Sequence, residues 1–196
     1  AKDFLERAFT IIFVASILIW FLESFDARLY PVVDSANSLL AVIGKQIAFI
    51  YRGEVFVTSV DYATTKQITH TPSAEQGLSF APDNRSLAYS TERNGNWELV
   101  IAKIERKEDP NFPNATLIKE EIILPSDKIE RSYPQYSPDG KELAFIQDRR
   151  KLMVVNLETK KVRQITDGSF WPSTGGGFEY QWSPDGKWFA LCFTGN

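Results

Sequence analysis

The sequence predicts an all-β protein: an incomplete β-propeller of about three and a half blades that follows an N-terminal hydrophobic helix. One phrase occurs three times, as "FAPDNRSLAYS" at 80–90, "YSPDGKELAFI" at 136–146 and "WSPDGKWFALC" at 182–192. Its second half returns once more, because "GKQIAFI" at 44–50 matches "GKELAFI" in the copy at 136–146. Short apolar runs separated by turn residues fill the rest of this region, which is typical of successive antiparallel strands.

The first domain is expected over residues 1–43, as a transmembrane-like helix and a short amphipathic linker. Residues 8–22 carry no charge, but a helix of about fifteen residues spans only about 22 Å, less than the bilayer core of about 30 Å. A membrane-spanning helix over 4–23 is therefore one interpretation, and a buried soluble helix is another. A signal-peptide core is a third, although the preceding residues are not net basic and no small-x-small cleavage site follows.

The second domain is expected over residues 44–196, as a partial propeller. The repeat places four alanines at one structural position, with spacings of 40, 56 and 46 residues: Ala48, Ala88, Ala144 and Ala190. Such spacings suit blades of about forty residues. The expected sheets cover 44–72, 76–124 and 130–168, with an unfinished strand pair at 178–194, all arranged as an open arc.

Each complete copy of the phrase predicts an aromatic strand end that leads into a tight turn. Proline sets φ at the second turn position, aspartate bonds back to the backbone, and glycine or asparagine takes a positive φ. In chain order these residues are Phe80, Pro82, Asp83 and Asn84; Tyr136, Pro138, Asp139 and Gly140; and Trp182, Pro184, Asp185 and Gly186. The alanine in the strand that follows predicts close packing between adjacent blades.

No residue with catalytic potential is predicted to work as a catalyst. His70 lies in "ITHTPS", without a nucleophile motif beside it, so we expect it in an exposed turn between blades. Cys192 lies on a predicted strand, where a small buried side chain is the ordinary role of a cysteine.

Three further features are predicted to be structural. Asp83, Asp139 and Asp185 belong to equivalent turns in different blades, so we expect them to serve those turns and not a shared metal ion. The segment "STGGGFE" at 173–179 lacks the lysine of a phosphate-binding loop and is expected to be a flexible connection. The insertion "ERKEDPNFPNATLIKEE" at 105–121 is predicted to be a solvated loop, with a partner-contact loop as the alternative.

Composition excludes several classes of protein. The net charge is −3, and the basic residues are dispersed, which argues against nucleic-acid binding. One cysteine rules out a disulfide within the chain, and one histidine with one cysteine is too few for a Cys/His zinc site. We therefore expect no catalytic residue, no metal and no cofactor.

The repeat phrases resemble the TolB-type propeller repeat. Further phrases outside the repeat, among them "RGEVFVTSVDYATTKQITHTP" and "STERNGNWELVIAKI", resemble the N-terminal propeller of bacterial tricorn-type serine peptidases of the cell envelope. This resemblance covers residues 46–196 and implies a non-catalytic module that guides peptides toward a protease domain. That domain, with its nucleophile, would lie beyond Asn196, so the chain itself is not expected to be an enzyme.

Residues 1–48 show a second resemblance. "FLERAFTIIFVASILIWFLESFD", followed by "DSANSLLAVIGKQIA", is similar to a late membrane segment of FeoB-type ferrous iron transporters. No GTP-binding loop accompanies it, so no residue for transport is implied. The two resemblances meet within residues 44–48, where a natural fusion, a misassembled reading frame and a designed chimera all remain possible origins.

The predicted function is that of a non-catalytic binding or scaffold module from a cell-envelope tricorn-type peptidase, tethered to the membrane by its helix. The alternative is a piece of a FeoB-type transporter that carries an appended propeller. The expected partners are a peptide or protein ligand, the membrane, and a second chain that pairs with open propeller edges. The expected location is the inner membrane, with the propeller in the periplasm.

Overall fold

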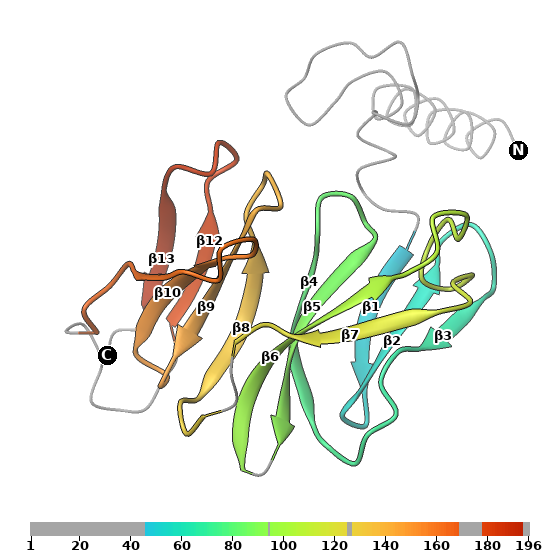
Figure 1. Ribbon diagram of the computed structural model, residues 1–196, viewed down its shortest axis with the longest axis horizontal. Coiled ribbons are helices and arrows are strands. Elements are labelled where there is room, and N and C mark those ends of the chain that lie inside the picture. Colours follow the sequence, from blue (N-terminus) through green and yellow to red (C-terminus); the bar gives the residue numbers. More distant parts are fainter. Residues whose placement is uncertain (1–45, 94, 125–126, 169–177, 194–196) are drawn as a thin grey trace, which may run out of the picture. The chain divides into compact units, whose positions relative to one another are not determined.

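The structure is a computed structural model that describes residues 46–93, 95–124, 127–168 and 178–193, and the regular structure of these residues is entirely β (Figure 1). No helix among them is long and apolar enough to cross a membrane. The helix predicted over 4–23 lies outside the described residues, as does most of the glycine-rich segment at 173–179.

The described strands form four sheets in chain order, and strands that are consecutive in sequence are neighbours in each sheet. The first sheet contains β1 (Gln46–Tyr51), β2 (Glu54–Ser59) and β3 (Thr65–Gln67); the second contains β4 (Glu75–Phe80), β5 (Ser86–Arg93), β6 (Asn96–Ile104) and β7 (Ile118–Ile122). The third contains β8 (Arg131–Tyr136), β9 (Glu142–Gln147), β10 (Lys151–Asn156) and β11 (Val162–Gln164); the fourth contains β12 (Phe178–Trp182) and β13 (Phe189–Phe193).

The strands fall where the repeat predicted them. The second and third sheets are four-stranded antiparallel meanders that match the predicted limits of 76–124 and 130–168, except that β4 begins one residue earlier, at Glu75; the fourth is the expected strand pair. Four-stranded meanders are the units from which propellers are built. The prediction of successive blade-like sheets is therefore confirmed for the described residues.

The strands alternate side chains between two faces of each sheet. We call the face toward the following sheet in sequence the forward face, and the face toward the preceding sheet the backward face. In the second sheet, Leu87 and Tyr89 of β5 belong to the core cluster shared with Val55 and Val57 of the first sheet, whereas Ala88 belongs to the cluster shared with the third. The core is thus divided into layers between consecutive sheets.

The predicted role of the repeated alanines is confirmed at the inner junctions. Ala88 and Ala144 are each 0% exposed and lie on forward faces, where they contact the clusters of the following sheet. Ala48 packs against the cluster between the first and second sheets. A methyl group at this position leaves room for the larger side chains of the next backward face. Ala190, at the same position of β13, is exposed.

In the first and third sheets, a buried threonine makes the same hydrogen bond beyond the end of the short outer strand. The Thr69 hydroxyl accepts a bond of 2.9 Å from the Val55 N–H, and the Thr166 hydroxyl accepts one of 2.9 Å from the Leu152 N–H. Both threonines end a "QIT" phrase, two residues after the last residue of β3 and of β11. The side chain replaces a backbone partner at the point where the short outer strand ends.

Replacing Thr166 with valine is expected to lower the free energy of unfolding by about 1–3 kcal/mol, because the shape is kept while the buried Leu152 N–H loses its acceptor. Urea denaturation of the full chain, followed by far-ultraviolet circular dichroism, measures the loss. The exposed Thr65 provides the matched control, since Thr65→Val is expected to change stability by less than about 0.5 kcal/mol. Equal effects of the two substitutions would contradict this role.

Candidate functional site

The repeated turns use their aspartates as the sequence predicted. The Asp139 carboxylate accepts bonds from the Lys141 N–H at 3.1 Å and from the Ser137 hydroxyl at 2.7 Å. Donation by Ser137 and by the backbone lowers the pKa of Asp139. The same backbone bond recurs at Asp83 and Asp185. Each of these carboxylates is therefore engaged in its own turn.

Successive turns also interlock between sheets. Gly140 has a φ of +72°, and a Cβ added there would lie 3.2 Å from Cδ of Pro82 in the preceding turn. At Gly186 the corresponding atom would lie 3.6 Å from Cδ of Pro138. The glycine thus serves the geometry of its turn and also makes room for the proline of the neighbouring sheet.

The ends of β4, β8 and β12 meet beside these turns and line a cavity of about 380 Å³. The cavity is built from equivalent repeat positions of three consecutive sheets, so the same kinds of side chain recur around it. Its lining residues are Ser79, Phe80 and Pro82; Gln135, Tyr136, Ser137 and Pro138; and Gln181, Trp182 and Pro184.

A side chain from one sheet fixes the aromatic residue of the next sheet around this cavity. The Ser79 hydroxyl accepts a bond of 3.0 Å from the N–H of Tyr136. One repeat later, the Gln135 side-chain oxygen accepts a bond of 3.2 Å from the N–H of Trp182, and the Trp182 indole donates to the Gln135 carbonyl at 3.2 Å. The aromatic walls are therefore held in place before any ligand arrives.

The chemistry of the cavity suits binding. The described lining residues are aromatic, proline, serine and glutamine, and none of them carries a charge. Burial raises the pKa of the Tyr136 phenol, which therefore stays protonated and neutral near neutral pH. Gln181 is exposed and can offer both a donor and an acceptor to a ligand. Such a site can hold apolar groups and amides.

The aromatic and proline positions of this cavity were predicted from the sequence only as parts of turns, and not as a site. The available signal was their repetition, because equivalent positions in consecutive propeller blades converge near the inner strand ends. Ser79, Gln135 and Gln181 precede the aromatic residue in each copy. They were missed because isolated serine and glutamine residues carry no motif.

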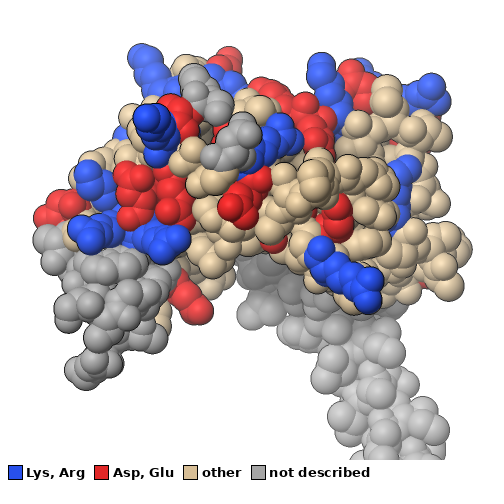
Figure 2. Space-filling view, turned by 90° about the horizontal axis from the view of Figure 1, so that it is seen from below, with Lys and Arg blue, Asp and Glu red and all other residues tan. Residues whose placement is uncertain are grey.

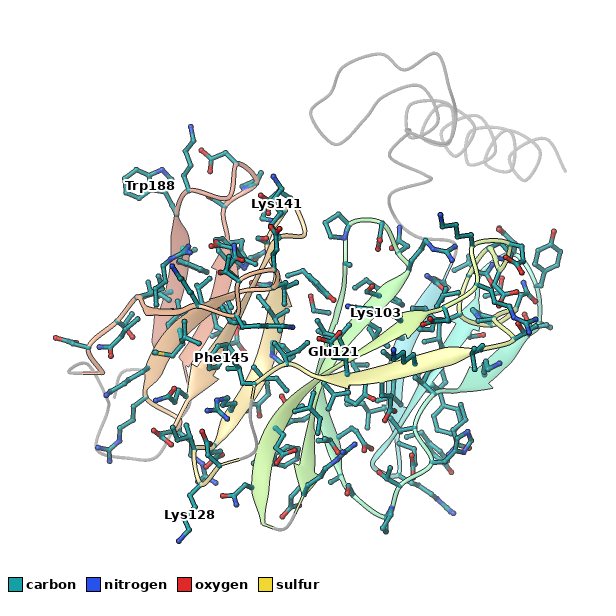
Figure 3. All side chains as sticks on the ribbon, in the orientation of Figure 1. Lys103, Glu121, Lys128, Lys141, Phe145 and Trp188 are labelled. Carbon is teal, nitrogen blue, oxygen red and sulfur yellow. The ribbon has the colours of Figure 1, made fainter. Side chains whose placement is uncertain are left out.

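On the face drawn in Figure 2, lysine and arginine are interspersed with aspartate and glutamate, so no patch of one charge sign stands out on that face. Glu121 illustrates the pattern, since it accepts bonds from Lys103 at 3.0 Å and from Lys160 at 2.9 Å; Lys103 and Glu121 are labelled in Figure 3. In the part of the chain that the structure describes, no three histidine, cysteine or acidic residues are grouped as a metal site would require.

The two residues considered for catalysis, His70 and Cys192, belong to different parts of the propeller. His70 is exposed in the connection between β3 and β4, in the kind of position that the sequence predicted. Cys192 lies on β13, as predicted, but the prediction that it is buried was wrong, because its side chain is exposed. It occupies the forward face of β13, and within the described residues no later sheet covers that face.

A buried carboxyl lies between the first and second sheets. Glu75 accepts bonds from Thr71 at 3.0 Å and from Thr91 at 3.1 Å, and Thr69 bridges to Glu54 at 2.6 Å. Burial raises the pKa of Glu75, and the threonine bonds oppose that rise. Because threonine hydroxyls donate to its oxygens, we assign this carboxyl a structural role in joining the first and second sheets.

The insertion at 105–121 was predicted to be a solvated loop, and this prediction was wrong for its centre and for its end, where β7 (Ile118–Ile122) pairs with β6. Phe112 is 0% exposed and packs 6.0 Å from Phe80, within the core between the first two sheets. Asp109 accepts bonds from the Thr116 N–H at 2.7 Å and the Thr116 hydroxyl at 2.9 Å. Arg85 donates to the carbonyl of Asp109 at 2.7 Å. The charged residues at 105–108 are exposed, whereas Asp109 is buried, and the Phe112 ring anchors the segment in the core.

Solved structures that share this fold include two TolB proteins. TolB from Acinetobacter baumannii superimposes with a TM-score of 0.53 at 22% sequence identity, and the match covers 75% of this chain and 34% of that protein. A structure assigned as TolB from Agrobacterium tumefaciens gives a TM-score of 0.51 at 18% identity, covering 72% of this chain and 47% of that protein. No model of a known protein family matches the sequence, and no curated protein sequence matches it.

The comparisons show a TolB-like β-propeller fold, as the repeat predicted. The matched part of the chain spans less than half the length of either TolB structure.

Proposed function

We propose that this propeller is a non-catalytic module that binds an extended, uncharged segment of a peptide or protein at the cavity between β4, β8 and β12. The observation that carries the proposal is the composition of the cavity. Three consecutive sheets present aromatic, proline and amide groups from equivalent positions, and the described lining is free of charge. Aromatic-lined grooves are typical binding sites for extended, proline-rich peptide segments.

The arrangement favours an extended peptide over a compact small molecule. Aromatic and proline surfaces contact proline or aromatic side chains, and side-chain amides pair with the donors and acceptors of a peptide backbone. A charged ligand residue would lose its hydration here without meeting an opposite charge among the described lining residues. The expected ligand is therefore a neutral segment rich in proline or aromatic residues.

A first experiment compares capped octapeptides that differ at one position. Neutral proline- and aromatic-containing peptides, labelled for fluorescence anisotropy, are expected to bind the full chain more tightly than versions with glutamate or lysine at the central position. Mass spectrometry of the recovered peptides is expected to show them intact. Cleaved peptides would contradict a non-catalytic role, and equal affinity for all peptides would contradict the proposed site.

A second experiment locates the binding on the chain. Gln181→Ala is expected to weaken binding by about 2- to 13-fold, the effect of removing one hydrogen bond worth about 0.5–1.5 kcal/mol. Gln147→Ala, the same change at the end of β9 and outside the cavity lining, is the matched control and should leave affinity unchanged. Similar losses in both variants would place the binding elsewhere.

We further propose that the module belongs to a tricorn-type peptidase of the cell envelope, with residues 1–43 as its membrane tether. The support is the similarity of its non-repeat phrases to that family. Sequencing the gene on both sides of this segment tests the context. A protease domain downstream supports the proposal, whereas a GTPase domain upstream supports the alternative of a FeoB-type transporter.

A further inference from the structure

Tyr133 of β8 combines an exposed side chain with a strained backbone. The residue is 52% exposed, although the third sheet packs against a described sheet on each side. Its φ is +52°, a left-handed conformation that a bulky residue rarely adopts, and the proline that follows favours extended backbone at the residue before it. Residues held in such conformations are concentrated at sites that contact ligands.

The backbone of this strand does not require a tyrosine at residue 133. Gly77 occupies the equivalent position of β4 with a φ of +65°, and in both sheets the pairing register shifts at this position. Glycine adopts this conformation without the penalty that a side chain causes. The strain at Tyr133 is therefore a cost of keeping its side chain at this point of the strand.

The neighbouring sheets hold Tyr133 from both sides. A Cβ added at Gly77 would lie 2.8 Å from Cα of Tyr133 and 3.3 Å from its ring atom Cδ1, so the ring lies beside β4 where glycine leaves room. On the other side, the Tyr180 hydroxyl of β12 donates to the Tyr133 carbonyl. The backbone that carries the ring is thus positioned before a ligand arrives.

Tyr133 also lies close to the candidate binding site, because β8 is one of the three strands whose ends line the cavity. The lining residues Gln135 and Tyr136 follow it by two and three positions, which correspond to about 7–10 Å along a strand. In β4, Gly77 precedes the lining residue Ser79 by two positions. An extended peptide has a similar rise per residue, so a peptide held in the cavity reaches Tyr133 two or three residues further along.

We propose that Tyr133 is a second contact for the peptide and selects an aromatic or proline side chain two or three residues away from the one in the cavity. This inference rests on the peptide-binding function proposed above. A half-exposed tyrosine ring offers an apolar face with a polar edge, which suits packing against another ring. The strained conformation is maintained for this contact and not for the stability of the fold.

A peptide series tests the position of the contact. Capped, neutral octapeptides carry two tryptophans separated by one to five positions in a background of serine and glycine, and anisotropy measures their affinity for the full chain. The native chain is expected to bind most tightly when the second tryptophan lies two or three positions from the first. Affinity that does not depend on the spacing would overturn the inference.

Two variants distinguish a ligand contact from a structural role. Glycine and asparagine both accept a positive φ, so Tyr133→Gly and Tyr133→Asn remove the ring and relieve the strain. Each is expected to bind the best peptide about 2- to 13-fold more weakly, the effect of losing one aromatic pair. The midpoint of urea denaturation is expected to stay the same or rise. Unchanged affinity would overturn the inference, and so would a lower midpoint, which would assign the ring to the fold.

Controls separate this inference from the proposed function. Tyr62→Gly changes a tyrosine that is 66% exposed, between β2 and β3 and outside the cavity lining, and should leave affinity unchanged. If Gln181→Ala weakens binding and the Tyr133 variants do not, peptide binding at the cavity stands and the Tyr133 contact is wrong. If the native chain binds no peptide of the series, the proposed function fails and the Tyr133 contact fails with it.

Discussion

Replacing Gly77 with alanine is expected to destabilise the propeller by about 2–5 kcal/mol. Gly77 lies in β4 with a φ of +65°, at an irregularity where the pairing register with β5 shifts. An alanine in this left-handed backbone conformation costs about 1–2 kcal/mol of stability. Its Cβ would also lie 2.8 Å from Cα of Tyr133, and overpacking against a backbone atom adds about 1–3 kcal/mol.

Gly95→Ala separates the two contributions. Gly95 has a φ of +77°, and a Cβ there would meet nothing within 4 Å. This variant therefore carries the conformational penalty without the clash. Urea denaturation of both variants is expected to show the larger loss at Gly77, and equal losses would mean that β4 and β8 can move apart without penalty.

The second large effect is expected from Phe112→Ala. The ring is fully buried beside Phe80, so its removal should lower the free energy of unfolding by about 3–5 kcal/mol. The loop should also become sensitive to added protease, because the ring is its main apolar anchor in the core. Both urea denaturation and limited proteolysis followed by mass spectrometry measure these changes.

Leu117→Ala is the matched control in the same segment. Leu117 is 49% exposed, so its truncation is expected to change stability by no more than about 0.5 kcal/mol. If Phe112→Ala were equally mild, the loop would not depend on its buried ring.

The parts of the fold that depend on local chemistry could be predicted from the sequence. Proline, aspartate and glycine at fixed positions specify the same turn wherever they occur together. The alternation of apolar residues after each turn then fixes which side chains are buried. Repetition strengthened both signals, because an accidental match at one copy would not recur at the others.

The parts that depend on neighbouring sheets could not be predicted in this way. Phe112 lies among prolines and charges, and its burial requires a hydrophobic gap between two sheets that the local sequence does not reveal. Cys192 sits on a strand of ordinary apolar pattern, yet its exposure depends on whether another sheet covers that strand. The close approach of Gly77 to Tyr133 likewise joins residues that are far apart in sequence.

The candidate binding site could likewise be predicted from the sequence only in part. Each lining position could be assigned to a strand end or a turn, but the cavity arises only when three sheets stand side by side. A single copy of the repeat holds one third of its wall. Sites of this kind become visible in a sequence when equivalent positions of successive repeats are compared as a set.

The layered core has a consequence for how a disturbance spreads through the molecule. Each apolar cluster is shared by two consecutive sheets, so the energetics approach those of a one-dimensional array with nearest-neighbour coupling. A cavity or a strained residue in one apolar cluster destabilises the two sheets that share this cluster. It affects a third sheet only indirectly, by weakening the packing between those two sheets. Cooperativity is then a local property. Within the described residues, partial unfolding is expected to begin at the first and fourth sheets, each of which packs against one other described sheet.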